Sequence, residues 1–252
     1  MNYEETFRKM KAMRMLGMHE AFKMSLETKQ HQQLASDQLI HLLIDAEYED
    51  RQKRKIQRHL TAARFRYQSC VEEIDFSSPR GIEKNQLLRL ASCQFIERKE
   101  NILITGPTGV GKSYLASALG HQACMKGFKV LYYNSAKLFS QLKMCRADGS
   151  YLKWINRLEK QDLLIMDDFG LQPLDQENRL MLLEVIEDRH GRRSTIVTSQ
   201  LPVIKWHELF GEQTIRRCGV LDRIVHTAHR LELKGESMRK KKSSIKQKNP
   251  VS

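Results

Sequence analysis

The stretch NILITGPTGVGKS, residues 101–113, decides the fold. Asn101–Thr105 form a short apolar run typical of a buried strand, and a helical stretch, YLASALGHQA, follows the glycines. A glycine-rich loop between a strand and a helix turns its backbone N–H groups inward at a positive helix N-terminus. The pattern G-x-x-x-x-G-K-[S/T] therefore predicts a site for the phosphates of a nucleotide. Its residues are Gly106, Pro107, Thr108, Gly109, Val110, Gly111, Lys112 and Ser113.

Two side chains at the end of this loop carry specific chemistry. Lys112 supplies a positive charge to the β- and γ-phosphates, and the Ser113 hydroxyl is suited to ligating Mg²⁺. The alternative is a glycine-rich turn that carries a surface lysine. The strand before the loop and the helix after it argue against that alternative.

A second motif, LLIMDD, follows at residues 163–168. Its apolar part predicts a buried strand, and acids at the carboxyl end of such a strand face the crevice where ligands bind in open α/β sheets. We expect Asp167 to hold Mg²⁺ through its water shell and Asp168 to polarise the attacking water. Read alone, two acids after a strand often mark only the start of a loop. Their place after the glycine-rich loop favours the functional interpretation.

Beyond residue 81, short apolar runs alternate with helical stretches such as Gly111–Met125 and Gln176–Arg189. This alternation predicts an α/β fold in which helices flank both faces of a parallel sheet. The predicted strands are Asn101–Thr105, Lys129–Asn134, Leu163–Asp167, Thr195–Ser199 and Arg230–Leu233.

Before the SSPRG linker at residues 77–81, the chain shows helical periodicity and no convincing strand. We expect a first helix to end near Gly17 and a second to start at Ser36, a favourable N-cap, and to continue through a basic segment. The sequence thus predicts a small all-helical domain at 1–78, an α/β domain at 79–235 and a basic, disordered tail at 236–252.

The 252-residue chain has a net charge of +13, and two stretches account for it. Residues 51–66 hold many cations and no acid, and the tail from Lys234 to Lys248 is nearly as basic. Such runs are often solvated faces, but two isolated runs that carry the whole net charge favour double-stranded DNA as partner. The predicted DNA contacts are Arg51, Arg54, Lys55 and Arg58.

Composition excludes several other classes of protein. No apolar run approaches the ~20 residues that span a bilayer, and the acidic N-terminus does not resemble a signal peptide. The five cysteines are well separated and form no CxxC pair, which argues against a zinc ribbon and a disulfide framework. We therefore expect a cytoplasmic protein that does not bind membranes.

Residues 81–239 resemble the AAA+ ATPases, and within them the IstB family of transposition helper ATPases, in the initiator and helicase-loader branch related to DnaC. GPTGVGKS and LLIMDDFG indicate only a P-loop ATPase. STIVTSQLPVIKWHE and LDRIVHTAHRLELKGESMR carry the family resemblance. The resemblance implies an AAA+ fold that uses ATP and Mg²⁺, with Asp168 standing where most relatives have the longer Glu.

The resemblance also implies roles for residues outside the two motifs. Either Ser199 or Gln200 is similar to sensor 1, which reads the γ-phosphate. Arg223 resembles the arginine finger that a neighbouring subunit supplies, with Lys112 and Asp168 completing the catalytic set; an ion pair of Arg223 with Asp222 is the structural alternative. Arg216 and Arg217 are further candidates for the finger. Arg239 is similar to sensor 2, although a solvated or DNA-facing arginine would fit as well.

These expectations lead to one preferred function and three alternatives. The preferred one is an ATP-dependent protein that forms a homo-oligomer on DNA, with nucleotide at subunit interfaces, and assists a cognate transposase. A DnaC-like replicative helicase loader would share the fold. A DNA-binding structural protein without turnover and a small-molecule P-loop kinase are the others, and the +13 charge argues against the kinase.

Overall fold

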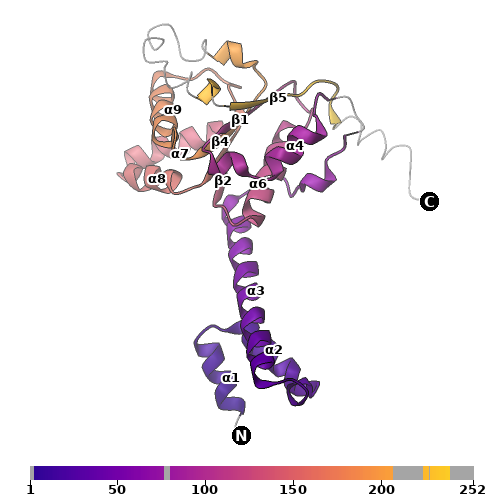
Figure 1. The fold of residues 1–252 in the computed structure, drawn as a ribbon. Helices are drawn as coiled ribbons and strands as arrows, with labels where there is room; N and C mark the ends of the chain where they lie inside the picture. Colours follow the sequence, from indigo (N-terminus) through magenta and orange to yellow (C-terminus); the bar gives the residue numbers. More distant parts are fainter. Residues whose placement is uncertain (1–2, 77–79, 207–223, 227, 239–252) are drawn as a thin grey trace, which may run out of the picture. The chain divides into compact units, whose positions relative to one another are not determined.

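The computed structural model describes residues 3–76, 80–206, 224–226 and 228–238. The chain divides into two compact units, Met1–Arg58 and His59–Ser252 (Figure 1). This division lies before the domain boundary predicted at residue 78, because Phe65, Val71 and Ile74 belong to the hydrophobic core of the second unit. Within the described ranges, no helix combines the length and the apolar character that crossing a membrane requires.

The first unit is helical, as predicted. Its elements are α1 (Tyr3–Ala12), α2 (Leu16–Glu27), the short 3-10 helix η1 (Gln30–Gln32) and α3 (Ser36–Ala63), which continues into the second unit. The Phe7 and Phe22 rings, with centroids 5.6 Å apart, join α1 to α2. α3 begins at the predicted Ser36 and runs on through the basic segment.

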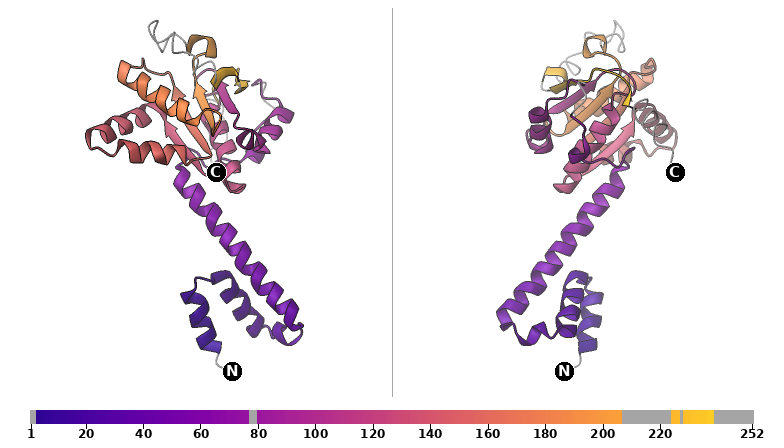
Figure 2. Two further views of the ribbon diagram at one scale, coloured as in Figure 1. Left: turned by 60° about the vertical axis from the view of Figure 1, so that its left-hand side comes forward. Right: turned by 90° about the vertical axis from the view of Figure 1, so that its right-hand side faces the viewer.

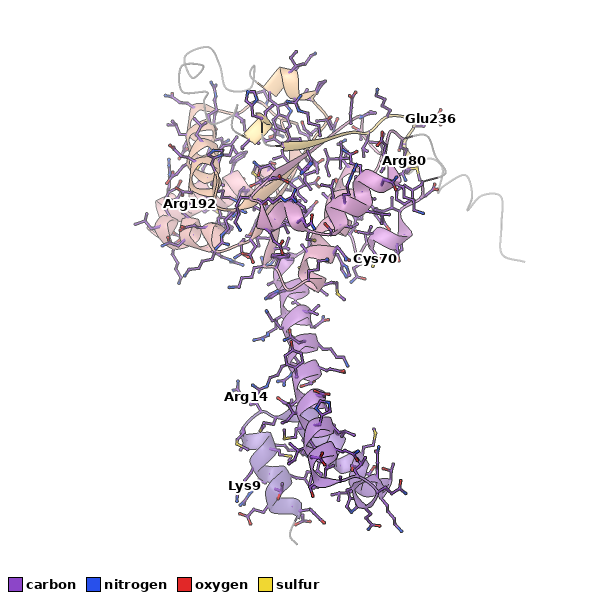
Figure 3. The ribbon with its side chains drawn as sticks, in the orientation of Figure 1. Lys9, Arg14, Cys70, Arg80, Arg192 and Glu236 are labelled. Carbon is purple, nitrogen blue, oxygen red and sulfur yellow. The ribbon has the colours of Figure 1, made fainter. Side chains whose placement is uncertain are left out.

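Gly17 lies inside α2, so the prediction that it ends the first helix is wrong. α1 ends at Ala12, and Arg14, labelled in Figure 3, takes a φ of 57° in the turn that follows. A Cβ atom at position 17 would lie 2.3 Å from the Ala46 carbonyl oxygen of α3. Glycine therefore permits the close approach of α2 to α3, since any side chain would meet the facing backbone.

Among the described residues, the second unit is built on five parallel strands in the order β2-β3-β4-β1-β5. All five predicted strands are present, with β3 extended past its predicted end and β5 shifted toward the N-terminus. Their bounds are β1 (Asn101–Thr105), β2 (Val130–Asn134), β3 (Leu163–Phe169), β4 (Ser194–Ser199) and β5 (Ala228–Glu232).

Helices cover both faces of the sheet (Figure 2). Ile102 and Ile104 of β1 pack with α4 (Lys84–Ala91) and α6 (Lys112–Met125) in one cluster, whereas Leu103 joins the cluster on the opposite face. That second face carries α7 (Ser135–Ala147), α8 (Tyr151–Glu159) and α9 (Gln176–Arg189). The short elements of this unit are η2 (Val71–Glu73), α5 (Gln94–Glu97) and η3 (Val203–Lys205).

Parallel strands place their carboxyl ends at one edge of the sheet, where ligands bind in this architecture. Thr105 of β1 pairs with Ser199 of β4, and Asn134 of β2 pairs with Asp167 of β3. The two sequence motifs, although far apart in the chain, therefore meet at one edge.

Candidate nucleotide-binding site

The loop between β1 and α6 depends on its glycines. Gly106, Gly109 and Gly111 have φ values of 143°, 85° and 103°, which side chains rarely tolerate. A Cβ at Gly106 would lie 2.2 Å from the Leu233 carbonyl oxygen, and one at Gly109 would lie 2.2 Å from Ser237 Oγ. The backbone can therefore close around a ligand only because these positions lack side chains.

Lys112, the first residue of α6, turns back over this loop. Its ammonium donates hydrogen bonds to the carbonyl oxygens of Gly106, at 2.7 Å, and Pro107, at 2.8 Å. Burial lowers the pKa of Lys112, while Asp168 and Asp167 oppose that shift. The charge thus lies at the mouth of the loop, where the phosphates of a nucleotide would bind.

The first acid of the second motif, Asp167, is fully buried at the end of β3. Ser113 Oγ donates a 2.8 Å hydrogen bond to its Oδ1 atom, which also accepts a bond from the Thr198 hydroxyl. Its Oδ2 atom accepts a bond from the Tyr132 hydroxyl. The Ser113 hydroxyl and the Asp167 carboxylate supply the oxygen ligands that Mg²⁺ prefers, so these residues fit Mg²⁺.

The second acid, Asp168, lies in a bulge of β3. The register against β4 shifts between Met166 and Phe169, and Asp168 has a φ of 57°. Its backbone N–H donates to Thr198 Oγ1 at 3.0 Å, which fixes the bulge. Asn134 Nδ2 donates to its carboxylate at 3.3 Å. A non-glycine residue in the left-handed region stores strain of the kind found at functional sites.

The two candidates for sensor 1 occupy different environments. Ser199 is fully buried, donates to the Phe169 carbonyl oxygen at 2.8 Å and accepts from the Leu201 N–H at 3.1 Å. Gln200 Oε1 instead accepts a 2.8 Å hydrogen bond from Thr108 of the phosphate loop. Of the two, Gln200 contacts the loop through its side chain, whereas Ser199 contacts it through its backbone carbonyl oxygen, which accepts from the Gly106 N–H at 3.3 Å.

The remaining predicted ATP-site arginines lie outside the described residues. These are Arg223, its alternatives Arg216 and Arg217, and Arg239. A cavity of about 210 Å³ opens beside Asp168 and Asn134 on the side of α7, and none of the predicted phosphate-loop residues lines it.

Comparison with known proteins identifies the family. The family model described as IstB-like ATP binding protein matches residues 8–246. The chain belongs to the IstB-like ATP-binding proteins.

Individual relatives agree with this assignment. A curated relative from Sinorhizobium fredii (strain NBRC 101917 / NGR234), named as an ATP-binding protein of an insertion sequence, is 43% identical over 93% of this chain and 96% of its own length. Another from Pseudomonas aeruginosa, named for the insertion sequence IS21 and for ATP binding, is 30% identical over 90% of this chain and 87% of its own length.

Solved structures confirm the fold. The crystal structure of DnaI, at 18% identity, aligns with a TM-score of 0.57 over 71% of this chain and 94% of its own. This IstB-like protein thus has the predicted AAA+ fold and is a P-loop ATPase.

The predicted DNA-contact residues of the IstB-like chain differ in how free their charges are. Arg51 Nε contacts Glu47 Oε1 at 2.6 Å, and Arg54 Nη2 contacts Asp50 Oδ2 at 2.6 Å. Lys55 and Arg58 are exposed, and Arg58 donates to the Arg54 carbonyl oxygen at 3.3 Å. Two of the four predicted DNA-contact residues, Arg51 and Arg54, are therefore paired with acids of the same helix.

Five residues that contact the two acids or the phosphate loop were not among the predicted site residues. Thr198, Tyr132 and Asn134 bond the two acids from neighbouring strands, and Arg66 contacts both acids from the segment before the sheet. Arg80, labelled in Figure 3, also reaches the phosphate loop, at 3.5 Å from the Val110 carbonyl oxygen. Thr198 lies in the stretch STIVTSQ, but no role was predicted for it. The contacts of all five depend on tertiary structure, which no spacing in the sequence reveals.

Proposed function

We propose that this IstB-like protein is an ATP-dependent, DNA-binding helper of a transposase, and that ATP hydrolysis controls its assembly on DNA and its release. The observation that carries the proposal is the convergence of Lys112, Ser113 and Asp167 at one edge of the sheet, in a chain whose relatives are named for insertion sequences. A cytoplasmic location and a cognate transposase as partner are parts of the same proposal.

The site residues divide the chemistry among themselves. The loop N–H groups and Lys112 bind the phosphates of ATP, and Ser113 with Asp167 holds Mg²⁺, which neutralises charge on the β- and γ-phosphates. Asp168 orients and polarises the attacking water. Gln200, joined to Thr108, follows the position of the loop and serves as sensor 1. Arg239, outside the described residues, is proposed to contact the nucleotide as well.

DNA binding is assigned to α3 and the basic tail. A helix that presents cations binds phosphates through release of counterions and carries little base preference. Lys55 and Arg58 are the most available of the four predicted contacts, since Arg51 and Arg54 are paired with acids.

Oligomerisation follows from the proposed role of Arg223. A finger that a neighbouring subunit supplies stabilises charge developing on the γ-phosphoryl group and contributes ~10³–10⁵ in rate in well-studied enzymes. ATP then binds at an interface between copies, and turnover depends on assembly.

Turnover in mixtures of variants tests this proposal. Wild-type ATPase activity per molecule is expected to rise with protein concentration and with duplex DNA, and Lys112→Ala is expected to abolish it. Arg223→Ala and Asp168→Asn should each be inactive alone. Mixing them should restore activity, because one chain supplies the intact finger and the other the intact Asp168.

Two results would contradict parts of the proposal. ATPase activity per molecule that does not depend on protein concentration or on DNA would contradict the assembly mechanism. If both variants are folded and their mixture shows no ATPase activity, Arg223 does not act as a finger between subunits. Addition of a purified candidate transposase tests the partner, because a helper should change the yield of strand transfer only when ATP is present.

A further inference from the structure

A cation from outside both motifs pairs with the two acids of the nucleotide site. Arg66 Nη1 lies 3.1 Å from Asp168 Oδ2 and 3.5 Å from Asp167 Oδ2. Arg66 follows the end of α3 at Ala63 and precedes the strands of the sheet. It therefore belongs to the connector between the long helix and the ATPase core.

Asp167 has no acceptor capacity left in this arrangement. A carboxylate offers about four lone-pair sites, and four donors use them. Ser113 and Thr198 donate to Oδ1, and Tyr132 and Arg66 to Oδ2. A hydrated metal ion that uses this carboxylate must displace one of the four donors.

Arg66 is the donor that can leave most easily. Thr198 and Tyr132 are buried within the sheet, and Ser113 is itself the proposed metal ligand. The Arg66 side chain is 43% exposed. Its guanidinium would also be repelled by a divalent cation a few ångströms away, whereas the neutral hydroxyls would not.

The connector backbone is held on both sides of Arg66. The Phe65 ring contacts Tyr132, with centroids 6.4 Å apart, and the Tyr67 ring contacts Tyr114, with centroids 6.2 Å apart. Release of Arg66 therefore requires rotation of its side chain into solvent, away from the two acids and from the Tyr67 ring, whose centroid lies 5.6 Å from the guanidinium carbon. The neighbouring rings can stay in place.

We propose that Arg66 is a positioning residue that competes with Mg²⁺ for Asp167 and Asp168. Without metal and nucleotide it pairs with both acids, which holds Asp168 away from its task of polarising water. When Mg²⁺–ATP binds, the guanidinium leaves and Asp168 becomes available. The inference rests on the proposed Mg²⁺ site, and it gives the connector after α3 a contact that changes with nucleotide state.

Metal binding, measured without turnover, tests the competition. Electron paramagnetic resonance reports free Mn²⁺ during titration of the full chain in the presence of AMPPNP, which is not hydrolysed. Arg66→Gln is expected to lower the half-saturating Mn²⁺ concentration about five-fold, the order expected for a partly exposed ion pair. Arg66→Lys, which keeps the charge, should lie closer to wild type.

Arg64→Gln is the matched control, because it removes the same charge two residues away from an exposed position. It should leave the Mn²⁺ titration unchanged. An unchanged titration for Arg66→Gln would overturn the competition. A higher Mn²⁺ requirement, or weaker AMPPNP binding at saturating Mn²⁺, would also overturn it, since Arg66 would then contact the phosphates. If the wild-type chain shows no metal-dependent binding of AMPPNP, the proposed Mg²⁺ site itself fails.

Discussion

Thr108 Oγ1 donates a 2.8 Å hydrogen bond to Gln200 Oε1, which joins the phosphate loop to the residue that follows β4. Any ligand that draws the Thr108 hydroxyl toward itself must loosen this bond. The bond thus links the loop to the end of β4, whose Thr198 contacts both acids.

Gln200→Ala should lower the ATPase kcat while leaving thermal stability near that of wild type, because this side chain contacts the loop and not the core. Ser199→Ala should instead lower the stability of the fold and leave the ATPase kcat near that of wild type. It removes two buried hydrogen bonds and should cost about 1–3 kcal/mol of unfolding free energy. Steady-state kinetics and urea denaturation of both variants check the assignment, and a stable, inactive Ser199→Ala would reverse it.

Asp168→Asn should reduce kcat by ~10²–10⁴, the usual contribution of a positioned acid or base. Asparagine tolerates the left-handed backbone that Asp168 adopts, so the bulge and the fold should persist. Binding of AMPPNP, measured by calorimetry, should therefore be retained. Loss of nucleotide binding together with turnover would show that Asp168 acts on affinity and not on the attacking water.

Gly106→Ala should abolish nucleotide binding, since its Cβ would lie 2.2 Å from the Leu233 carbonyl oxygen and the loop would have to shift. Gly149→Ala is the matched control: its φ is 77° and a Cβ there meets nothing within 4 Å. The control should show only backbone strain of about 1–2 kcal/mol in thermal unfolding, with unchanged AMPPNP affinity. Equal losses of affinity in the two variants would contradict this account of the loop.

Acid should weaken the first unit through Glu47. Burial raises the pKa of this carboxyl, but hydrogen bonds from Arg51 and the Met18 N–H outweigh burial, and the pKa lies below its usual 4.5. Its contribution to stability is therefore complete above pH 4.5 and is lost as the pH falls through the folded-state pKa. Unfolding followed by circular dichroism should show an acid-dependent loss in wild type that is smaller in Glu47→Gln. Parallel profiles would exclude this carboxyl as the cause.

Removing Lys55 and Arg58 together should flatten the salt dependence of DNA binding. Each phosphate contact contributes about 0.9 to the slope of log K against log salt, so the double alanine variant should lose up to about 1.8. The double alanine variant at Arg51 and Arg54 should lose less, because those cations already pair with Glu47 and Asp50. Fluorescence anisotropy of labelled DNA at several salt concentrations measures the slope for each double variant. Equal slopes for the two variants would contradict the expected difference between them.

Local patterns predicted the sheet because they reflect local physics. The five apolar runs form strands, of which β1, β3 and β4 are almost wholly buried and β5 is buried only at Leu231. GPTGVGKS links a strand to a helix, since its glycines permit the positive φ values that this loop requires. Residues whose roles depend on strand order could not be found in this way. Thr198, Tyr132 and Arg66 reach Asp167 from distant segments, and no spacing in the sequence brings them together.

The wrong prediction for Gly17 has a similar origin. Glycine usually ends helices, but Gly17 lies inside α2 because tertiary packing against Ala46 requires a residue without a side chain. The SSPRG linker suggested a boundary at residue 78, whereas the aromatic side chains at 65 and 67 attach the preceding segment to the ATPase core.

The most direct test of the central claim is sedimentation velocity of the full chain with a fluorescent duplex DNA, with ATPγS, with ADP and without nucleotide. If nucleotide binding at Lys112 and Ser113 drives assembly on DNA, a large complex should form with ATPγS, shrink or vanish with ADP, and be absent in Lys112→Ala. Complexes of the same size in every nucleotide state, or undiminished in Lys112→Ala, would contradict the claim.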